Sequence, residues 1–406
     1  MGTTHSEMAD QPAHGSYDVV IIGGAIMGSS AAWFLSQNPD FDGRIAVIER
    51  DPSYQYSATA HTNSCLRQQF SNELNIRISQ FTASFIKNLR AHMDDPRVPE
   101  MTIQNYGYMY LADTPGFAKV LQENQQTQLA AGAETELLEP AEIARRYPFY
   151  NLDDIILGSI NLKDEGYWDG GTLFDWFRRS ARAHGVEYVT GEVVDITTAS
   201  GRVTGVTLAD GTHIHAGQVV NASGPRAART AAMAGVHLPV EPRKRFTWIF
   251  SAEQPLDREL PLTIDPSGVH VRQDGPKTYL AGCPADPDPA VDPMDFAMDH
   301  GRWQDHVWPI LATRIPQFES IRVVTEWAGH YAFNTLDQNA VLGAHPDLPN
   351  FIFLNGFSGH GLQQSPAMGR ATAEWLTYGA YRTLDLTPFS YERILRNEPI
   401  IEKAVI

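Results

Sequence analysis

The first fifty residues alternate between apolar runs and a glycine-rich turn. Residues 17–22 form a β-branched run (YDVVII), residues 25–37 form a longer run of small and apolar residues, and residues 44–49 (RIAVIE) form a second short apolar run. Short apolar runs are typical of buried parallel strands, and a longer run between two of them is typical of a helix. The pattern predicts a strand, a glycine turn, a helix and a second strand that ends in an acid.

The glycine turn is typical of a dinucleotide-binding unit. Its fingerprint consists of Gly23, Gly24, Ala25, Ile26, Met27 and Gly28. Glycines let the backbone approach a pyrophosphate, whose charge is stabilised by the N-terminal end of the helix. Glu49 ends the second strand and is placed to accept hydrogen bonds from ribose hydroxyls, which favours FAD or NAD over NADP. Ala25 stands where the middle glycine is usual, and its methyl group limits the approach of the pyrophosphate.

Charge and cysteine usage exclude several classes of partner and site. The chain has 406 residues, and its 31 basic and 48 acidic residues give a net charge of −17. Such a surface repels phosphate backbones and anionic lipids, so we expect no nucleic-acid partner. Two cysteines, Cys65 and Cys283, are too few for a disulfide framework or a cysteine-based metal site, and no histidine spacing indicates a metal. The uncharged stretch 19–39 coincides with the fingerprint unit, so we expect no membrane span. The N-terminal residues do not have the basic, Ser-rich composition of a transit segment, so we expect a cytoplasmic protein.

Later segments resemble one family of flavoproteins. These are residues 57–69 (SATAHTNSCLRQQ), residues 327–343 (WAGHYAFNTLDQNAVLG) and residues 350–376, which contain GFSGHGLQQSPAMGRA. They resemble the D-amino-acid-oxidase-like FAD-dependent oxidoreductases, which include sarcosine oxidase, glycine oxidase and dimethylglycine dehydrogenase. The nearest resemblance is to the FAD-dependent oxidoreductase-domain proteins. The resemblance runs from Tyr17 to about Tyr381 and implies non-covalent FAD as the cofactor.

The resemblance also implies an interleaved α/β architecture. We expect a Rossmann-like FAD-binding domain interleaved with an antiparallel-sheet α+β substrate domain. The FAD-binding domain is expected to comprise residues 17–94, 151–234 and 326–390, and the substrate domain residues 95–150 and 235–325. Residues 1–16 are expected to form a disordered tail and residues 391–406 a C-terminal extension. Apolar runs at 106–112, 245–251 and 279–282 are expected to supply strands of the antiparallel sheet.

Cofactor-binding residues beyond the fingerprint follow from the resemblance. They are Glu49, Arg50, Ser64, Leu66, Arg67, Val193, Gly224, Gly359, His360, Gly361, Leu362 and Gln363. Three positions depart from the sarcosine-oxidase pattern. His330 stands where that enzyme has the cysteine that bonds the flavin, Gln363 replaces a lysine, and His270 replaces the oxygen-activating lysine. An imidazolium at His270 would supply positive charge only if protonated, so oxidase and dehydrogenase activity both stay open.

The residues expected to do the chemistry are those that position the substrate. An amino-acid substrate needs a cation that fixes its carboxylate, and bidentate arginine suits this purpose. The candidates are Arg67, Arg272, and Arg243 or Arg245. Strand alternation places His270 and Arg272 on one face, and the resemblance places Tyr331 in a segment that faces the flavin. We therefore expect His270, Arg272, Tyr331 and Arg67 in the catalytic centre.

Three functions are consistent with these residues. The first is FAD-dependent oxidation of a small, anionic N-substituted amino acid, such as sarcosine, iminodiacetate or an imino acid. A hydride would pass to flavin N5, the resulting imine would hydrolyse, and O2 or another acceptor would reoxidise the flavin. The second is a flavoprotein that serves as an assembly or chaperone factor. The third, an NAD-dependent dehydrogenase, rests on the fingerprint alone. The oligomeric state is not readable from the sequence.

Overall fold

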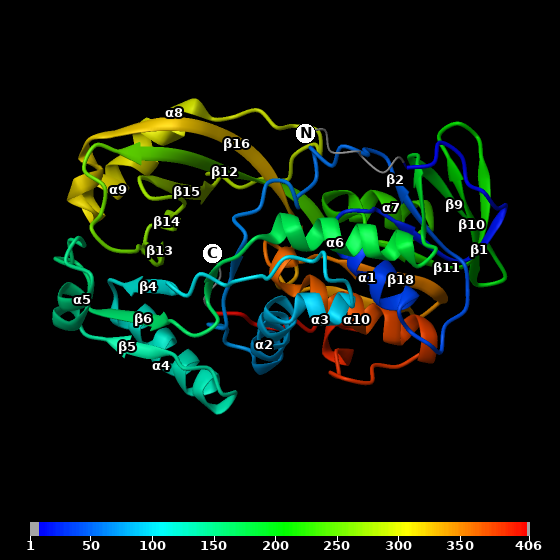
Figure 1. The fold of residues 1–406 in the computed structure, drawn as a ribbon, viewed down its shortest axis with the longest axis horizontal. Coiled ribbons are helices and arrows are strands. Elements are labelled where there is room, and N and C mark those ends of the chain that lie inside the picture. The colour runs from blue at the N-terminus through cyan, green and yellow to red at the C-terminus, as the bar shows by residue number, and fades with distance from the viewer. Residues whose placement is uncertain (1–7, 404–406) are drawn as a thin grey trace. The chain divides into compact units, whose positions relative to one another are not determined.

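Two compact units make up the chain. The computed structural model describes residues 8–403. Within them, the first unit comprises residues 8–62, 170–242 and 331–400, and the second comprises residues 63–169, 243–330 and 401–403. Figure 1 shows how each unit collects segments that are far apart in the sequence. This confirms the expected interleaved α/β fold.

The first unit is built on an eight-stranded, largely parallel sheet. The strand order is β17-β18-β11-β1-β2-β8; β10 also pairs with β11, and β9 pairs with β10. The strands are β1 (Ser16–Ile22), β2 (Ile45–Glu49), β8 (Glu187–Thr190), β9 (Val193–Ala199), β10 (Arg202–Leu208), β11 (His213–Asn221), β17 (Val341–His345) and β18 (Leu348–Asn355). β1 pairs in parallel with β2 and β11, as in a doubly wound fold. β10 and β11 pair in antiparallel fashion as a hairpin.

Helices of small residues pack closely in this unit. The helices are α1 (Ile26–Ser36), α6 (Gly170–Ala183), α7 (Ala227–Met233), α10 (Gly361–Tyr378) and α11 (Glu392–Arg396). A side-chain carbon at Gly369 of α10 would overlap Ser30 of α1, and Ser30 Oγ donates to the Ser365 carbonyl at 2.7 Å. The two helices that follow the two glycine turns are thereby held side by side.

The second unit is built on a predominantly antiparallel sheet of eight strands. Their order is β16-β12-β15-β14-β13-β4-β6-β5, and β3 and β7 form a separate pair. The strands are β3 (Cys65–Leu66), β4 (Tyr108–Ala112), β5 (Glu136–Leu138), β6 (Leu157–Asn161), β7 (Gly166–Tyr167), β12 (Val240–Ala252), β13 (Leu262–Ile264), β14 (His270–Gln273), β15 (Thr278–Pro284) and β16 (Ile321–Asn334). The predicted strands at 106–112, 245–251 and 279–282 are present as β4, β12 and β15.

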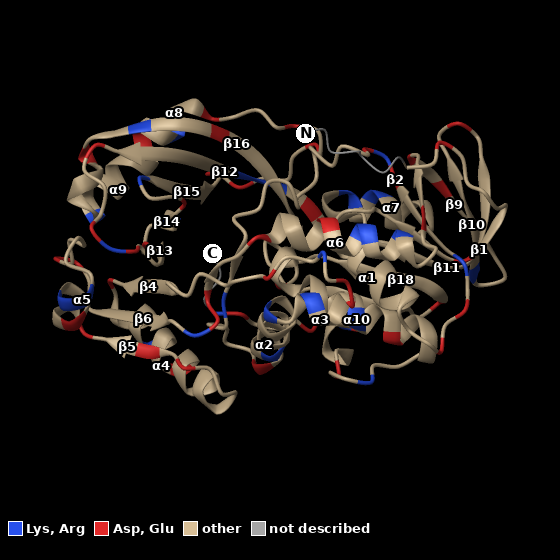
Figure 2. Cartoon of the chain, viewed as in Figure 1, with Lys and Arg blue, Asp and Glu red and all other residues tan. Residues whose placement is uncertain are grey.

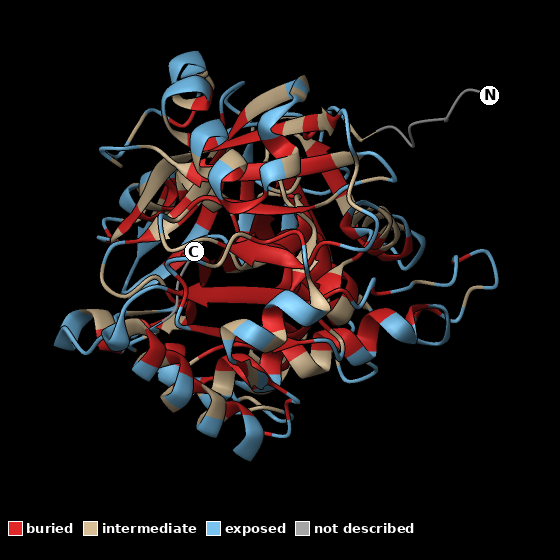
Figure 3. Cartoon of the chain, turned by 90° about the vertical axis from the view of Figure 1, so that its left-hand side faces the viewer, coloured by how far each residue is buried: buried red, intermediate tan, exposed pale blue. Residues whose placement is uncertain are grey.

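Helices cover this sheet, and an aromatic cluster fills its core. The helices are α2 (Glu73–Lys87), α3 (Leu89–Met93), α4 (Pro115–Ala130), α5 (Pro140–Arg146), α8 (His300–Arg302) and α9 (Trp308–Arg314). Phe250 stacks on Tyr279 with ring centroids 5.5 Å apart, and Phe318 contacts both rings. Figure 3 shows the buried positions following the strands and the exposed positions following the outer faces of helices.

The boundaries of the two units differ from those expected. The sequence assigned residues 63–94 and 151–169 to the FAD-binding domain, but the structure places all of residues 63–169 in the second unit. Strand pairing explains the difference: Cys65 pairs with Tyr167, and β4 pairs with β6 along its whole length. Hydrogen bonding to the antiparallel sheet therefore fixes this segment.

The two ends of the chain also differ from expectation. Residues 1–7 of the expected disordered tail lie outside the described residues, but residues 8–16 are ordered. Ala9 forms a bridge to β8, donating to the Tyr188 carbonyl at 2.9 Å and accepting from the Thr190 N–H at 2.8 Å. The expected C-terminal extension is part of the first unit up to residue 400, where Tyr391 stacks on Phe353 with centroids 4.7 Å apart. Within residues 8–403, no helix has the length and apolarity needed to cross a membrane.

Candidate functional site

The fingerprint turn of the first unit has room only for glycine at its key positions. Gly23 has φ +100, and a side-chain carbon there would lie 2.5 Å from the carbonyl oxygen of Ala222, the residue directly after β11. A side-chain carbon at Gly28 would overlap the Gly23 carbonyl oxygen. The turn between β1 and α1 is therefore as tight as dinucleotide binding requires.

The N-terminus of α1 is suited to an anion. Its N-cap is Ala25, which makes no side-chain hydrogen bond to the helix, and no acid lies in the first turn. The Ile26 N–H donates to Thr59 Oγ1 at 3.3 Å. Since the first N–H groups of a helix carry its positive dipole, this end suits a pyrophosphate. The alanine in place of glycine is accommodated here because Ala25 has extended backbone.

Glu49 is anchored beside this turn. Its carboxylate accepts from the Gly24 N–H at 2.8 Å and from the Asp51 N–H at 2.9 Å. Burial raises its pKa, while these two N–H donors and Arg50 lower it. The carboxylate stands at the end of β2, where the ribose of a dinucleotide is recognised in such folds.

An aromatic and cationic group near Glu49 was missed by sequence reasoning. Tyr54 contacts Phe174 with ring centroids 5.0 Å apart, and the Arg178 guanidinium lies 5.3 Å from the Tyr54 ring centroid. Arg178 belongs to α6, where several basic residues gather (Figure 2). Tyr54 follows Glu49 by five positions in a polar loop, and nothing in that loop indicates that α6 lies opposite it.

The second glycine turn repeats the features of the first. Gly359 has φ +96, and a side-chain carbon there would overlap the ring of Tyr331. His360 is the N-cap of α10 but makes no side-chain capping bond, so Gly361, Leu362 and Gln363 begin the helix without one. Tyr331 and the predicted turn are thus in contact within the first unit.

The remaining predicted positions of this unit lie in the same sheet region. Val193 is buried at the start of β9, and Gly224, with φ +58, follows β11 with open space where a side-chain carbon would be. Two uncapped helix N-termini, a glycine cradle and an acid at the end of β2 fit a dinucleotide such as FAD.

Three predicted cofactor-binding residues, Ser64, Leu66 and Arg67, belong to the second unit. Arg67 is 1% exposed, and its guanidinium lies 4.1 Å from the Phe70 ring centroid. One of its nitrogens donates to the Gln69 carbonyl at 3.0 Å and also to the Tyr110 hydroxyl. The structure therefore shows Arg67 committed to partners in its own unit, and a role in binding FAD stays a prediction.

Arg272 is a buried cation that lies against the Tyr167 ring. It is 3% exposed, and its guanidinium lies 4.6 Å from the Tyr167 ring centroid. One nitrogen donates to the Gln273 carbonyl at 2.6 Å and pairs with Asp274 at 3.2 Å. Its Nε has no hydrogen-bond partner among the described residues. A buried guanidinium with an unused donor is a suitable anchor for a carboxylate.

His270 is buried on the same strand and is uncharged. It is 7% exposed, and its Nε2 lies 3.0 Å from the Asn63 amide nitrogen. Burial first, and then the charges of Arg245 and Arg272, lower the pKa of His270 to about 4. Its Nδ1 and the Asn63 amide oxygen lack hydrogen-bond partners within residues 8–403. The imidazolium considered from the sequence is therefore absent at neutral pH.

Three other predicted polar residues are held by partners of the second unit. Arg245 forms a bidentate pair with Asp288 at 2.9 and 3.1 Å, and Arg243 approaches the same carboxylate at 3.7 Å. His330 Nε2 lies 2.9 Å from the Asp295 carbonyl oxygen. Arg272 differs from both of these arginines because it is buried, whereas Arg243 and Arg245 are half-buried and share the Asp288 carboxylate. No cluster of metal-ligating side chains occurs in the described part of the chain.

Comparison with known families identifies the chain. Residues 18–375 match the family model described as DAO, FAD dependent oxidoreductase. The chain belongs to this family. It is 37% identical to FAD-dependent oxidoreductase domain-containing protein 1 of Xenopus laevis, over 96% of this chain and 85% of that protein. It is 24% identical to human mitochondrial sarcosine dehydrogenase, over 91% of this chain and 40% of that protein.

Solved structures show the same fold. L-proline dehydrogenase from P. horikoshii is 26% identical with a TM-score of 0.82, over 95% of this chain and 99% of that one. Glycine oxidase from Geobacillus kaustophilus is 21% identical with a TM-score of 0.78, over 93% and 98% of the two chains. These findings confirm the predicted family, the α/β flavoenzyme fold and FAD as the cofactor of the family.

Proposed function

We propose that this DAO-family oxidoreductase oxidises a small N-substituted amino acid, such as sarcosine, iminodiacetate or an imino acid. The observation that carries the proposal is Arg272, a buried guanidinium with an unused Nε in a cluster of tyrosines. Burying a cation is costly unless something compensates its charge, and one acid, Asp274, is paired with it at 3.2 Å. The names of two relatives, L-proline dehydrogenase and sarcosine dehydrogenase, support a secondary amine as the substrate.

The chain's own residues bind and orient the substrate in this proposal. Bound FAD would supply the acceptor for a hydride from the carbon next to the substrate nitrogen, and water would then hydrolyse the resulting imine. Arg272 fixes the substrate carboxylate, and Tyr167 covers one face of the guanidinium and limits access of water. Burial raises the pKa of Tyr167 and of Tyr106, so both phenols stay neutral hydrogen-bond donors. Positioning, rather than proton transfer, supplies the catalysis.

We further infer that the electron acceptor is not O2. The resemblance to sarcosine oxidase assigns oxygen activation to a lysine at the position of His270. Because burial and two arginines keep His270 neutral, it supplies no positive charge for superoxide. Slow reoxidation by O2 and fast reoxidation by an artificial acceptor are the expected results.

A regulatory or assembly role is the second candidate. The chain is 23% identical to the mouse mitochondrial pyruvate dehydrogenase phosphatase regulatory subunit, over 89% of this chain and 41% of that protein. The name of that relative indicates a regulatory function for a protein with a related sequence. In this case the chain would bind FAD without oxidising an amine.

Anaerobic titration of the purified flavoprotein separates the two candidates. Sarcosine, iminodiacetate and L-proline are added in turn while the flavin absorption is recorded. We expect one of them to bleach the flavin, and we expect the R272M variant to lose this response. The exposed Arg90, which pairs with Glu100, provides a matched control as R90M. A flavin spectrum that no amine changes, in either protein, contradicts the enzyme and favours the second candidate.

A further inference from the structure

A buried carboxyl group that the proposed mechanism does not use lies beside β7. Glu165 is completely buried and accepts three hydrogen bonds. The donors are the Gln68 backbone N–H, Gln69 Nε2 at 3.0 Å and Asn161 Nδ2 at 3.2 Å. Two of these three donors come from consecutive residues of the segment that follows β3. Glu165 is therefore a main anchor of that segment.

The anchored segment carries Arg67. The Gln69 carbonyl accepts from the Arg67 guanidinium at 3.0 Å, while the Gln69 side chain donates to Glu165. Gln69 is fixed further by Tyr108, whose carbonyl accepts from Gln69 Nε2 at 2.9 Å. One residue thus links the buried carboxyl to the buried guanidinium. A change at Glu165 changes how Arg67 is held.

The charged and titratable groups around Glu165 come from three elements. Arg67 faces it from the segment after β3, and Tyr108 and Tyr110 face it from β4. Glu402, near the end of the described chain, acts on Tyr110. Burial raises the pKa of Glu165 to about 7, against the opposing effects of its three donors and the Arg67 charge. The carboxyl therefore changes its charge near neutral pH.

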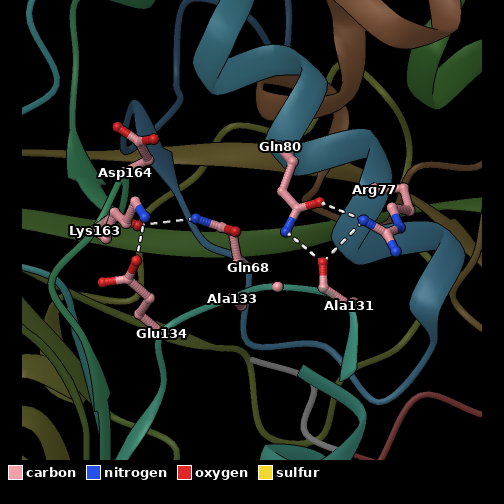
Figure 4. A pocket seen from close by; sticks show the side chains of 9 residues that line it. Gln68, Arg77, Gln80, Ala131, Ala133, Glu134, Lys163 and Asp164 are labelled. Atoms are coloured by element: carbon pink, nitrogen blue, oxygen red, sulfur yellow. Dashed lines mark hydrogen bonds and ion pairs between the residues drawn. The ribbon is translucent and has the colours of Figure 1, made fainter. Parts of the chain in front are cut away.

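The outer side of the same segment reaches solvent. Gln68 lines a cavity of about 340 Å³ together with Arg77, Gln80, Glu134 and Lys163 (Figure 4). Gln68 Nε2 donates to the Lys163 carbonyl at 2.8 Å across this cavity. The backbone N–H of the same residue points the other way, to Glu165.

We propose that Glu165 is a positioning residue whose protonation state sets how the segment 67–69, and with it the Arg67 guanidinium, is held. Ionised Glu165 balances the Arg67 charge, but burial makes the ionised form costly, so ionisation favours opening of the segment to water. Protonated Glu165 is a weaker acceptor and leaves more positive charge around Arg67. The consequence for substrate binding rests on the proposed function, in which Arg67 belongs to the catalytic centre. In that case the affinity of the protein for a carboxylate substrate falls as pH rises through about 7.

Hydrogen exchange of the FAD-loaded protein tests the positioning directly. Exchange of peptides covering residues 64–70 is followed between about pH 5.5 and 8.5 and corrected for intrinsic rates. We expect the Gln68 amide of the wild type to exchange about tenfold faster at the higher pH, because ionisation of the buried Glu165 favours the open, solvated segment. E165Q removes this pH dependence. E134Q, at an exposed glutamate paired with Lys163 in the same unit, keeps it.

Two results overturn the inference without reference to any substrate. One is that residues 64–70 of the wild type show the same protection from exchange at every pH. This measurement uses the wild type alone and does not depend on the folding of a variant. The other is an E165Q protein with wild-type protection at every pH. Either result means that the carboxyl does not control this segment.

Kinetics with the amine found by titration provides the second readout. We expect the wild-type KM to rise about tenfold relative to that of E165Q between pH 6 and 8, with kcat changed less than about twofold. A pH-independent ratio of the two KM values overturns the link to substrate binding. If no amine reduces the flavin, the proposed function fails, and the exchange experiment still decides whether Glu165 positions the segment.

Discussion

Substitution of Gly23 by alanine tests the assignment of the cofactor site. Two separate costs follow from the structure. Gly23 has φ +100, a conformation that costs a residue with a side chain about 1–2 kcal/mol. The added carbon would also lie 2.5 Å from the Ala222 carbonyl oxygen and 2.9 Å from its carbon. Ordinary contacts begin near 3.4 Å, so the turn must move by about 0.9 Å.

The expected magnitude adds these two costs. Overpacking of this kind costs about 1–3 kcal/mol, so G23A loses about 2–5 kcal/mol in total. The movement also shifts the N–H groups at the start of α1, and each lost hydrogen bond to a charged group costs about 1.5–3 kcal/mol. We therefore expect G23A to bind FAD at least tenfold more weakly and to unfold at a lower temperature.

Gly185 provides a matched control for the backbone cost. It belongs to the same unit and has φ +87, but nothing lies within 4 Å of the position that a side-chain carbon would occupy. G185A thus carries the conformational cost alone, about 1–2 kcal/mol. The measurements are FAD content, the FAD dissociation constant and the unfolding midpoint of each variant. Equal effects of G23A and G185A on FAD affinity would refute the assignment of the pyrophosphate to this turn.

Four further predictions follow from other parts of the structure. R272M raises KM for the amino-acid substrate about 100-fold, because a bidentate charged contact is lost, while the flavin spectrum is unchanged; steady-state kinetics checks this. H270K, which places a cation at this position, speeds flavin reoxidation by O2 by on the order of 100-fold, whereas H270Q leaves it unchanged in stopped-flow measurements. D337N destabilises the protein by about 3–5 kcal/mol, because it leaves the buried Arg393 without its carboxylate partner, and E392Q at an exposed pair changes the unfolding midpoint little. Burial raises the pKa of Glu165 from the ordinary value to about 7, so the folded state binds the additional proton and the unfolding free energy falls as pH rises from about 4.5 to 7. In denaturant titrations, the unfolding free energy of E165Q should change less with pH over this range than that of the wild type. A wild-type unfolding free energy that rises with pH over this range, together with an unchanged E165Q profile, would contradict the expected direction.

The segment 334–339 shows how a sequence leaves a role open that contacts decide. Its polar composition fits a pocket loop or a turn equally well. In the structure Asp337 accepts from Arg393 at 3.1 Å, from the Asn339 N–H at 3.0 Å and from the Ile400 N–H at 2.9 Å. The segment is a turn that anchors the C-terminal part of the first unit. Nothing in its sequence indicates partners about sixty positions away.

Local sequence determined the nucleotide-binding unit of this protein. β1, α1 and β2 are predicted by the apolar runs, the fingerprint glycines and Glu49. Such a prediction is possible because a strand, a tight turn and a helix each depend on residues that are neighbours in the sequence. The residues of the second glycine turn, before α10, followed from the family resemblance. The family resemblance, which extends over most of the chain, supplied the interleaved architecture and the cofactor.

Tertiary structure decided the charge states and the limits of the units. Residues 63–94 belong to the second unit because β3 pairs with β7, and such pairing joins residues a hundred positions apart. His270 is neutral because folding buries it next to two arginines, and Glu165 titrates near neutral pH because folding removes it from water. Desolvation and charge proximity are properties of the packed chain, so no local pattern in the sequence encodes them.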